Sequence, residues 1–288
     1  MSGPMNIQHF LHEETSTLTY VVYDERAGCA VVIDPVRDFE PHAARTSWTS
    51  AARVARYIDE RKLRVPYVID THAHADHMTG LPFFAARYGA RTVTGARVGE
   101  IQQAIRRIYG LPTDFPVDGR QFDDLIDEGD ELAVGSLVVR AMHTPGHTPA
   151  HMSWQVGDAV FVGDTLFMPD YGTARCDFPG GSAATLYASI RRLYALPDAT
   201  RLFMCHDYRP NDRPLRFETT VGEQKASNVQ LHSKTTEAEF TAFRIRRDAE
   251  LPVPALMLAS LQVNVRAGAL PQPEENGTAY LKIPLDRF

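Results

Sequence analysis

Four side chains that commonly bind metal ions fall within six consecutive positions of this 288-residue chain: His72, His74, Asp76 and His77. They follow the apolar segment 65–69, which has the composition of a short buried strand. The alternate spacing of the first three predicts that they lie on one side of an extended strand end, where His77 then turns back. Imidazole and carboxylate ligands together suit zinc, iron or manganese. The density of the motif therefore favours a metal site over a polar loop with chance histidines.

Three later segments each place one further candidate ligand at the end of an apolar, strand-like run. These candidates are His147, Asp164 and His206, and Gly146 and Gly163 allow sharp turns beside the first two. Residues at strand ends are held on a rigid sheet, which can aim their side chains into a common site. Each candidate taken alone is more often a hydrogen-bonded structural residue than a ligand. Their combination with the histidine-rich motif predicts one site built from four segments.

The order of these segments resembles that of the metallo-β-lactamase superfamily. The family pattern is His-x-His-x-Asp-His, followed by Gly-His, Gly-Asp and a late His, and the resemblance extends over about residues 7–208. The matching residues are His72, His74, Asp76, His77, His147, Asp164 and His206. The resemblance implies an α/β fold, the αββα sandwich of two mixed β-sheets flanked by helices. It also implies a metal cleft at one edge of the sheets.

The rest of the sequence has a pattern typical of such a sandwich. Helical periodicity is present in 50–62, and Ser182, Thr220 and Thr236 have the positions of helix N-caps. Strand-like runs occur at 18–23, 29–33, 67–69, 137–142 and 159–162. We predict a metallo-β-lactamase-like catalytic domain over 1–210, with 211–288 as a helical and irregular extension packed on the same domain. The Pro and Gly content of 251–284 predicts an ordered, irregular tail.

Composition and charge narrow the classes of function. The hydrophobic fraction of 44% and the charged fraction of 23% are ordinary for a globular protein. The formal net charge of -6 supplies no basic field to attract nucleic acid. We find no signal-peptide core and no apolar run of membrane-spanning length, which disfavours an exported β-lactamase. The three cysteines show no paired spacing, so we expect reduced thiols and a cytoplasmic location. The net charge and the lengths of the apolar runs lead us to expect neither nucleic-acid nor membrane partners.

Two further segments resemble bacterial persulfide dioxygenases, namely 170–181 and parts of the tail between 261 and 284. The resemblance implies oxidation of a thiol persulfide, commonly glutathione persulfide, with O2 to sulfite and free thiol. It implies one Fe(II) per chain, held by His72, His147 and Asp164, with the small-molecule persulfide and O2 as partners. Two histidines and one carboxylate form a facial triad, whose open positions can accept both substrates.

In this interpretation four of the matching residues lie outside the first coordination sphere, namely His74, Asp76, His77 and His206. They would orient ligands and bound water, with His206 and Tyr208 as catalytic candidates. A dinuclear zinc hydrolase of the glyoxalase II type stays open as an alternative, because all seven positions of a two-metal site are present. Two Zn(II) ions would then generate hydroxide for thioester hydrolysis. That site would use His72, His74 and His147 on one metal, Asp76, His77 and His206 on the other, and Asp164 as the bridge. A non-catalytic metal-binding scaffold is a third hypothesis, which the intact ligand set disfavours.

The sequence defines the substrate-binding residues less sharply. Tyr208 would either donate a hydrogen bond to substrate or bound oxygen, or form part of the core with its hydroxyl satisfied. Arg175 would either bind a substrate carboxylate or anchor its loop through Asp177, and we favour anchoring. The segment 174–179 departs from the Gly-Arg-Thr-Asp-Phe pattern of human-type relatives, so the identity of the thiol stays open.

Three further residues have no assigned role. We expect Cys176 and Cys205 to be buried, inert thiols, because no cation that would stabilise a thiolate is evident beside both. Arg266 would face either the cleft or a partner subunit. The oligomeric state stays open, with a homodimer as one expected assembly.

Overall fold

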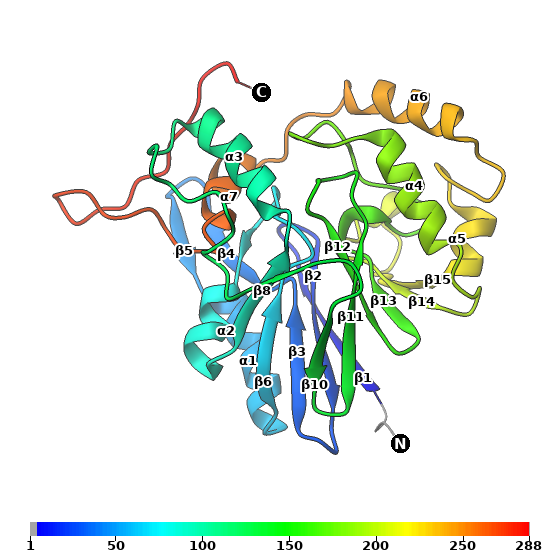
Figure 1. Ribbon diagram of the computed structural model, residues 1–288, viewed down its shortest axis with the longest axis horizontal. Helices are drawn as coiled ribbons and strands as arrows, with labels where there is room; N and C mark the ends of the chain where they lie inside the picture. Colours follow the sequence, from blue (N-terminus) through cyan, green and yellow to red (C-terminus); the bar gives the residue numbers. More distant parts are fainter. Residues whose placement is uncertain (1–4, 288) are drawn as a thin grey trace.

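The computed structural model describes residues 5–287, and two β-sheets packed face to face form its centre (Figure 1). The first sheet has the strand order β1-β2-β3-β6-β8-β9. It is antiparallel from β1 to β3 and parallel from β3 to β9. Its strands are β1 (Met5–His12), β2 (Thr17–Asp24), β3 (Cys29–Ile33), β6 (Arg64–Ile69), β8 (Arg91–Gly95) and β9 (Asp124–Ile126).

The second sheet follows the chain in the order β10-β11-β12-β13-β14-β15. Only its β13–β14 pair is parallel within the described residues. Its strands are β10 (Glu131–Val134), β11 (Leu137–His143), β12 (Met152–Val156), β13 (Ala159–Phe161), β14 (Arg201–Phe203) and β15 (Glu218–Thr220). A small third sheet joins β4 (Val36–Glu40) to β5 (Arg45–Ser47) and β7 (Met78–Thr79).

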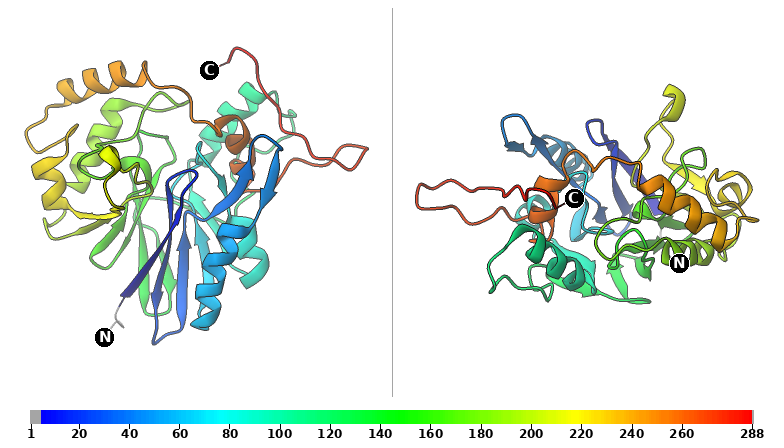
Figure 2. Two further views of the ribbon diagram at one scale, coloured as in Figure 1. Left: turned by 180° about the vertical axis from the view of Figure 1, so that it is seen from behind. Right: turned by 90° about the horizontal axis from the view of Figure 1, so that it is seen from above.

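Helices cover the outer faces of both sheets, which gives four layers (Figure 2). An apolar core that includes Tyr20 and Trp154 fills the space between the sheets. The helices on the first sheet are α1 (Thr49–Glu60), α2 (Leu81–Tyr88) and α3 (Val98–Tyr109), and those on the second are α4 (Ala183–Leu193), α5 (Val221–Ser227) and α6 (Glu237–Asp248). The predicted αββα sandwich of two mixed sheets is confirmed.

Local sequence signals located several of these elements. The apolar period of 50–62 corresponds to α1, which buries Ala51, Val54, Ala55 and Ile58. The predicted caps are also confirmed, because the side chains of Ser182, Thr220 and Thr236 each accept a hydrogen bond from a backbone N–H three residues later. Thr236 and Glu239 form a complete capping box.

The prediction of an irregular tail is wrong over one stretch. Residues Met257–Asn264 form helix α7, and the residues that follow it, 265–287, form neither helix nor strand. The apolar residues of α7 are spread around the helix and do not form one stripe, because most of the helix is buried. It therefore lacks the amphipathic period that reveals surface helices. No helix within residues 5–287 combines the length and apolar character needed to cross a membrane.

Candidate metal centre

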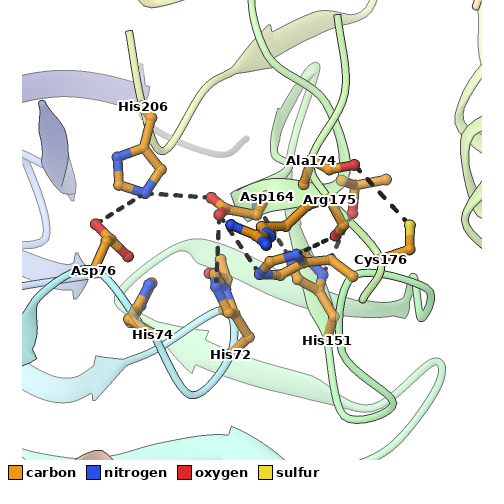
Figure 3. A network of polar contacts seen from close by, with 12 residues as sticks. His72, His74, Asp76, His151, Asp164, Ala174, Arg175, Cys176 and His206 are labelled. Carbon is orange, nitrogen blue, oxygen red and sulfur yellow. Dashed lines mark hydrogen bonds and ion pairs between the residues drawn. The ribbon is translucent and has the colours of Figure 1, made fainter. Parts of the chain in front are cut away.

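Four loops at one edge of the sandwich carry the predicted ligands. His72 follows β6, His147 follows β11, Asp164 lies in the 3-10 helix η1 (Gly163–Thr165) after β13, and His206 follows β14. All four side chains are buried. Figure 3 shows His72 and His206 directed toward the carboxylate of Asp164. The structure therefore brings together the residues that the sequence distributes over four segments.

Two glycines permit the close approach of these loops. Gly163 has a φ of +51°, and a Cβ there would lie 2.5 Å from His151 Nε2 and 2.7 Å from Thr71 Oγ1. Gly146 has a φ of +138°, and its Cβ would lie 2.3 Å from the backbone of Leu186. Both positions combine a backbone conformation that favours glycine with a space that excludes any side chain.

The first donor group contains His72, His147 and Asp164, whose potential ligand atoms all lie within 4.8 Å of one another. The Nε2 atoms of His72 and His147 lie 3.8 Å and 3.7 Å from Asp164 Oδ2. These distances are too long for hydrogen bonds. Among the described residues, His72 Nε2 and Asp164 Oδ1 are buried without any hydrogen-bond partner. One cation shared by the three side chains would satisfy them, and two imidazoles with a carboxylate suit iron(II) or zinc(II).

The second donor group contains His74, Asp76 and His77, whose potential ligand atoms also lie within 4.8 Å. Its carboxylate is already engaged, because Asp76 Oδ2 lies 3.1 Å from His77 Nδ1. His206 stands between the groups, with its Nε2 3.4 Å from Asp76 Oδ2 and 3.4 Å from Asp164 Oδ1. Within residues 5–287, His74 Nδ1 and His77 Nε2 are buried without a partner. The second group therefore also has donor atoms for an ion.

The histidine-rich motif does not lie on a strand end. β6 ends at Ile69, and residues 70–77 form an irregular loop that leads to β7. The predicted strand alternation of His72, His74 and Asp76 is therefore wrong. The loop separates His72 from the other two, which belong to the second donor group. Contacts with distant residues, not the period of a strand, set these side-chain directions.

Asp34, which the sequence analysis did not identify, holds this loop from behind. It accepts hydrogen bonds from the backbone N–H of Thr71 at 2.7 Å and from the Thr71 hydroxyl at 3.0 Å. His74 Nε2 donates to it at 3.1 Å. Burial alone would lower the pKa of His74, but the Asp34 carboxylate outweighs burial and raises that pKa to about 9. One sequence signal could have identified Asp34. It directly follows the apolar run 29–33, just as the predicted ligands follow apolar runs.

His151 is a second residue that the sequence analysis missed. Its buried ring stacks on that of His72, with centroids 4.8 Å apart. Its Nε2 accepts a hydrogen bond from the backbone N–H of Asp164 at 3.0 Å. That bond requires the proton of a neutral imidazole to be on Nδ1, which lies 3.1 Å from the Thr144 hydroxyl. His151 therefore supports two members of the first donor group at once.

Asn264, at the end of α7, binds the backbone of the motif loop. Its side-chain amide donates to the carbonyls of His74 and His77, each at 2.8 Å. Its Oδ1 accepts from the backbone N–H of Thr79 at 2.9 Å. The amide is buried, so these bonds replace solvent for three backbone groups. The C-terminal segment thereby fixes the shape of a ligand-bearing loop.

Helix α6 supports His147 through a buried ion pair. Arg244 Nη2 lies 2.7 Å from Asp248 Oδ1, and the Asp248 carboxylate accepts a hydrogen bond from the backbone N–H of Cys176 at 2.8 Å. The preceding carbonyl, that of Arg175, accepts from His147 Nδ1 at 2.7 Å. This bond leaves His147 Nε2 directed toward Asp164. Contacts of this kind orient a metal-binding imidazole.

The two donor groups differ in their electrostatic state. Burial, together with neighbouring imidazoles, holds the pKa of His72 well below its ordinary value. Burial also raises the pKa of Asp164, although nearby imidazoles oppose that effect. Burial disfavours the charged form of Asp76 as well, but the imidazoles of His206 and His77 outweigh it and lower its pKa. A cation would stabilise the first group, which combines a neutral imidazole with an insufficiently compensated carboxylate.

The donor groups open into a cleft of about 1060 Å³. Tyr208 lines it and is 39% exposed, with its ring stacked on His206 at a centroid distance of 5.5 Å. Phe167 and Tyr171 complete an aromatic wall around Tyr208. The predicted substrate residue Tyr208 therefore borders both the donor groups and the cleft.

Arg175 also borders the cleft, but its guanidinium is already bound. Two contacts of 2.6 Å join it to the Asp177 carboxylate, and a third of 2.6 Å joins it to the carbonyl of Pro252. This arrangement corresponds to the anchoring role. Substrate binding through Arg175 would require these bonds to break.

The three residues without assigned roles are either buried or held by contacts within the chain. Cys176 and Cys205 are buried, and burial raises the pKa of Cys176 to about 12 and that of Cys205 well above its ordinary value. Both are therefore protonated thiols at neutral pH, as expected. Arg266 lies over the ring of Phe115 at 4.6 Å and donates to the carbonyl of Gln262 at 3.1 Å.

Comparison with known proteins identifies the family of this fold and site. Residues 13–206 match the metallo-beta-lactamase superfamily, and the chain belongs to that superfamily. The donor cluster agrees with the metal-dependent chemistry of such a fold.

Several full-length relatives are similar to this chain. A probable metallo-hydrolase from Burkholderia pseudomallei is 47% identical over 98% of this chain and 99% of that protein. Glyoxylase B2 from Dictyostelium discoideum is 42% identical over 99% of each chain. Human mitochondrial persulfide dioxygenase ETHE1 is 28% identical over 92% of this chain and 90% of that protein. The crystal structure of ETHE1 from Myxococcus xanthus is 31% identical with a TM-score of 0.73, over 92% of this chain and all of the other.

Proposed function

We propose that this protein is an iron(II)-dependent persulfide dioxygenase acting on glutathione persulfide or a related small thiol persulfide. The balanced reaction is RSSH + O2 + H2O → RSH + SO3²⁻ + 2 H⁺. The observation that carries the proposal is the first donor group, which brings two imidazoles and one carboxylate together and leaves His72 Nε2 and Asp164 Oδ1 buried without a partner in the described chain. Similarity to human persulfide dioxygenase ETHE1 and to the Myxococcus ETHE1 structure supports it.

An iron(II) ion held by His72, His147 and Asp164 would supply the redox chemistry and bring both substrates into one coordination sphere. The chain itself provides the orientation. The Arg175 carbonyl fixes the ring of His147, and His151 fixes the backbone of Asp164. Burial of these groups limits access of water, so polar interactions within the site are strong.

A dinuclear metal hydrolase of the glyoxalase II type is the second candidate. The second donor group favours it, because His74 Nδ1 and His77 Nε2 are buried donor atoms without partners in the described chain. Similarity to relatives named glyoxylase B2 and probable metallo-hydrolase also supports it. In that reaction two ions would activate water for thioester hydrolysis.

Metal analysis combined with two assays separates the candidates. Protein loaded anaerobically with iron(II) is assayed for sulfite formation from glutathione persulfide and for hydrolysis of lactoylglutathione, each with and without O2. We expect one iron per chain, sulfite only under air, and little thioester hydrolysis. Thioester turnover that is undiminished without O2, with two metal ions per chain and no sulfite under air, would refute the dioxygenase and favour the hydrolase.

A further inference from the structure

A small apolar cavity lies behind His147, next to the main cleft. Its volume is about 20 Å³. Ile105 of α3, Leu261 of α7 and Ala75 of the motif loop contribute to its walls. Helices α3 and α7 lie side by side at this edge of the molecule, and their facing apolar residues form one core cluster (Figures 1 and 2). The cavity therefore lies at the border of this apolar cluster, where half-buried Phe178 and Pro179 complete its wall.

The lining of the cavity is unfavourable for water. A volume above about 10–15 Å³ can hold one water molecule, but the water needs about two to four hydrogen-bond partners. Among the lining side chains, His147 has its Nδ1 bound to the Arg175 carbonyl and its Nε2 directed toward Asp164. Only the hydroxyl of Thr148 remains, and it is buried with no partner in the described chain. A small, uncharged, apolar molecule fits this lining better than water does.

The position of the cavity connects it with the donor groups. Ala75, His147 and Phe178 line both the cavity and the main cleft. The ring of Phe178 stands edge-on to that of His147, with centroids 5.2 Å apart. The cavity therefore shares wall residues with the cleft, and one of them, His147, belongs to the first donor group.

We propose that this cavity is a docking site for dioxygen, which reaches the donor groups through the apolar cluster between α3 and α7. The inference rests on the proposed dioxygenase function, since a hydrolase has no use for the gas. Dioxygen is uncharged and forms no strong hydrogen bonds, so it partitions into apolar cavities in preference to water. Occupancy beside the donor groups raises its local concentration where the persulfide reacts.

Xenon binding and oxygen kinetics test the proposal together. Crystals of the parent protein under xenon pressure are expected to show a xenon peak between Ile105 and Leu261, a measurement that needs neither a variant nor a bound metal. Leu261→Phe should fill the cavity and abolish the peak. It should raise KM for O2 several-fold, with the iron content, the KM for persulfide and the kcat at saturating O2 unchanged. Leu258→Phe is the matched control, because Leu258 packs in the same cluster on α7 but does not line the cavity.

The outcomes separate this inference from the proposed function. If the parent protein consumes no O2 with any persulfide, the dioxygenase proposal fails and the oxygen role of the cavity fails with it. If the parent consumes O2 but its cavity holds an ordered water or no xenon, the docking site is wrong and the dioxygenase stands. An unchanged KM for O2 in a folded Leu261→Phe variant that has lost xenon binding would also overturn the docking site.

Discussion

Asp164 and Asp76 are both carboxylates among histidines, on either side of His206, yet their surroundings differ (Figure 3). Asp76 Oδ2 contacts His77 Nδ1 at 3.1 Å, and neighbouring imidazoles outweigh its burial and lower its pKa. Asp164 Oδ1 has no hydrogen bond within the described chain, and burial raises the pKa of Asp164. Nearby imidazoles, those of His206 and His77, therefore compensate the carboxylate of Asp76, whereas that of Asp164 is insufficiently compensated and would be stabilised by a cation. This difference leads us to expect metal in the first group, with the second group as its support.

The imidazoles show the same contrast. His74 of the second group donates to Asp34, and this pairing raises its pKa to about 9 despite its burial. His72 of the first group has a pKa held well below its ordinary value by burial and by nearby imidazoles. A neutral imidazole is the form that binds a metal ion. The lowered pKa of His72 therefore favours coordination, whereas the raised pKa of His74 favours its buried ion pair with Asp34.

Exchange of the two carboxylates for alanine should give the largest difference between the groups. Asp164→Ala should remove the bound metal and lower turnover by more than about 1000-fold, because it removes the only anionic ligand of the first group. Asp76→Ala, the matched control, should keep one metal ion per chain. Metal analysis and persulfide-dependent O2 uptake measure both effects. Equal loss of metal from both variants would break the distinction and favour a dinuclear site.

His206→Ala tests the residue between the groups. We expect the variant to keep its iron and to lose about 10- to 100-fold in activity, the usual effect of removing a group that orients a metal site. The parent protein and Asp164→Ala, measured by the same metal analysis, give the two reference values. Loss of iron as complete as in Asp164→Ala would show that His206 is a ligand.

Asn264→Ala tests whether the C-terminal segment shapes the motif loop. The change leaves the N–H of Thr79 and two loop carbonyls without partners, so we expect a loss of about 1–3 kcal/mol in the free energy of unfolding. Iron affinity should fall about 10-fold, because the loop carries His72. Denaturant unfolding and competitive metal titration measure these effects. Asn276→Ala, in an exposed turn, is the control and should change neither.

Tyr208→Phe should have the smallest effect. Loss of one hydrogen bond to substrate would lower kcat/KM by about 3- to 10-fold, with unchanged iron content and stability. Tyr171→Phe is the control, because Tyr171 packs on Tyr208 at a centroid distance of 4.6 Å and also lines the cleft. Identical kinetics for the parent and Tyr208→Phe would assign Tyr208 to packing of the aromatic wall.

The sequence by itself determined the donor residues and their order. His72, His147, Asp164 and His206 were identifiable because each follows an apolar run, and strand ends are local features of a sequence. The caps at Ser182 and Thr236 were equally local, since each bond spans only three residues. The αββα sandwich followed from the resemblance carried by these motifs.

Only the tertiary structure decided how the donors divide and what supports them. The division of the motif into two groups depends on an irregular loop whose carbonyls are bound by Asn264, up to 190 residues away along the chain. The supporting roles of Asp34 and His151, and the bond from Arg175 to the Pro252 carbonyl, likewise arise from contacts that fold formation creates. Helix α7 had no amphipathic period because it is largely buried. Residue types and short-range spacing can be read directly from the sequence. The partners of a buried polar group, in contrast, depend on which distant segments the fold packs beside it.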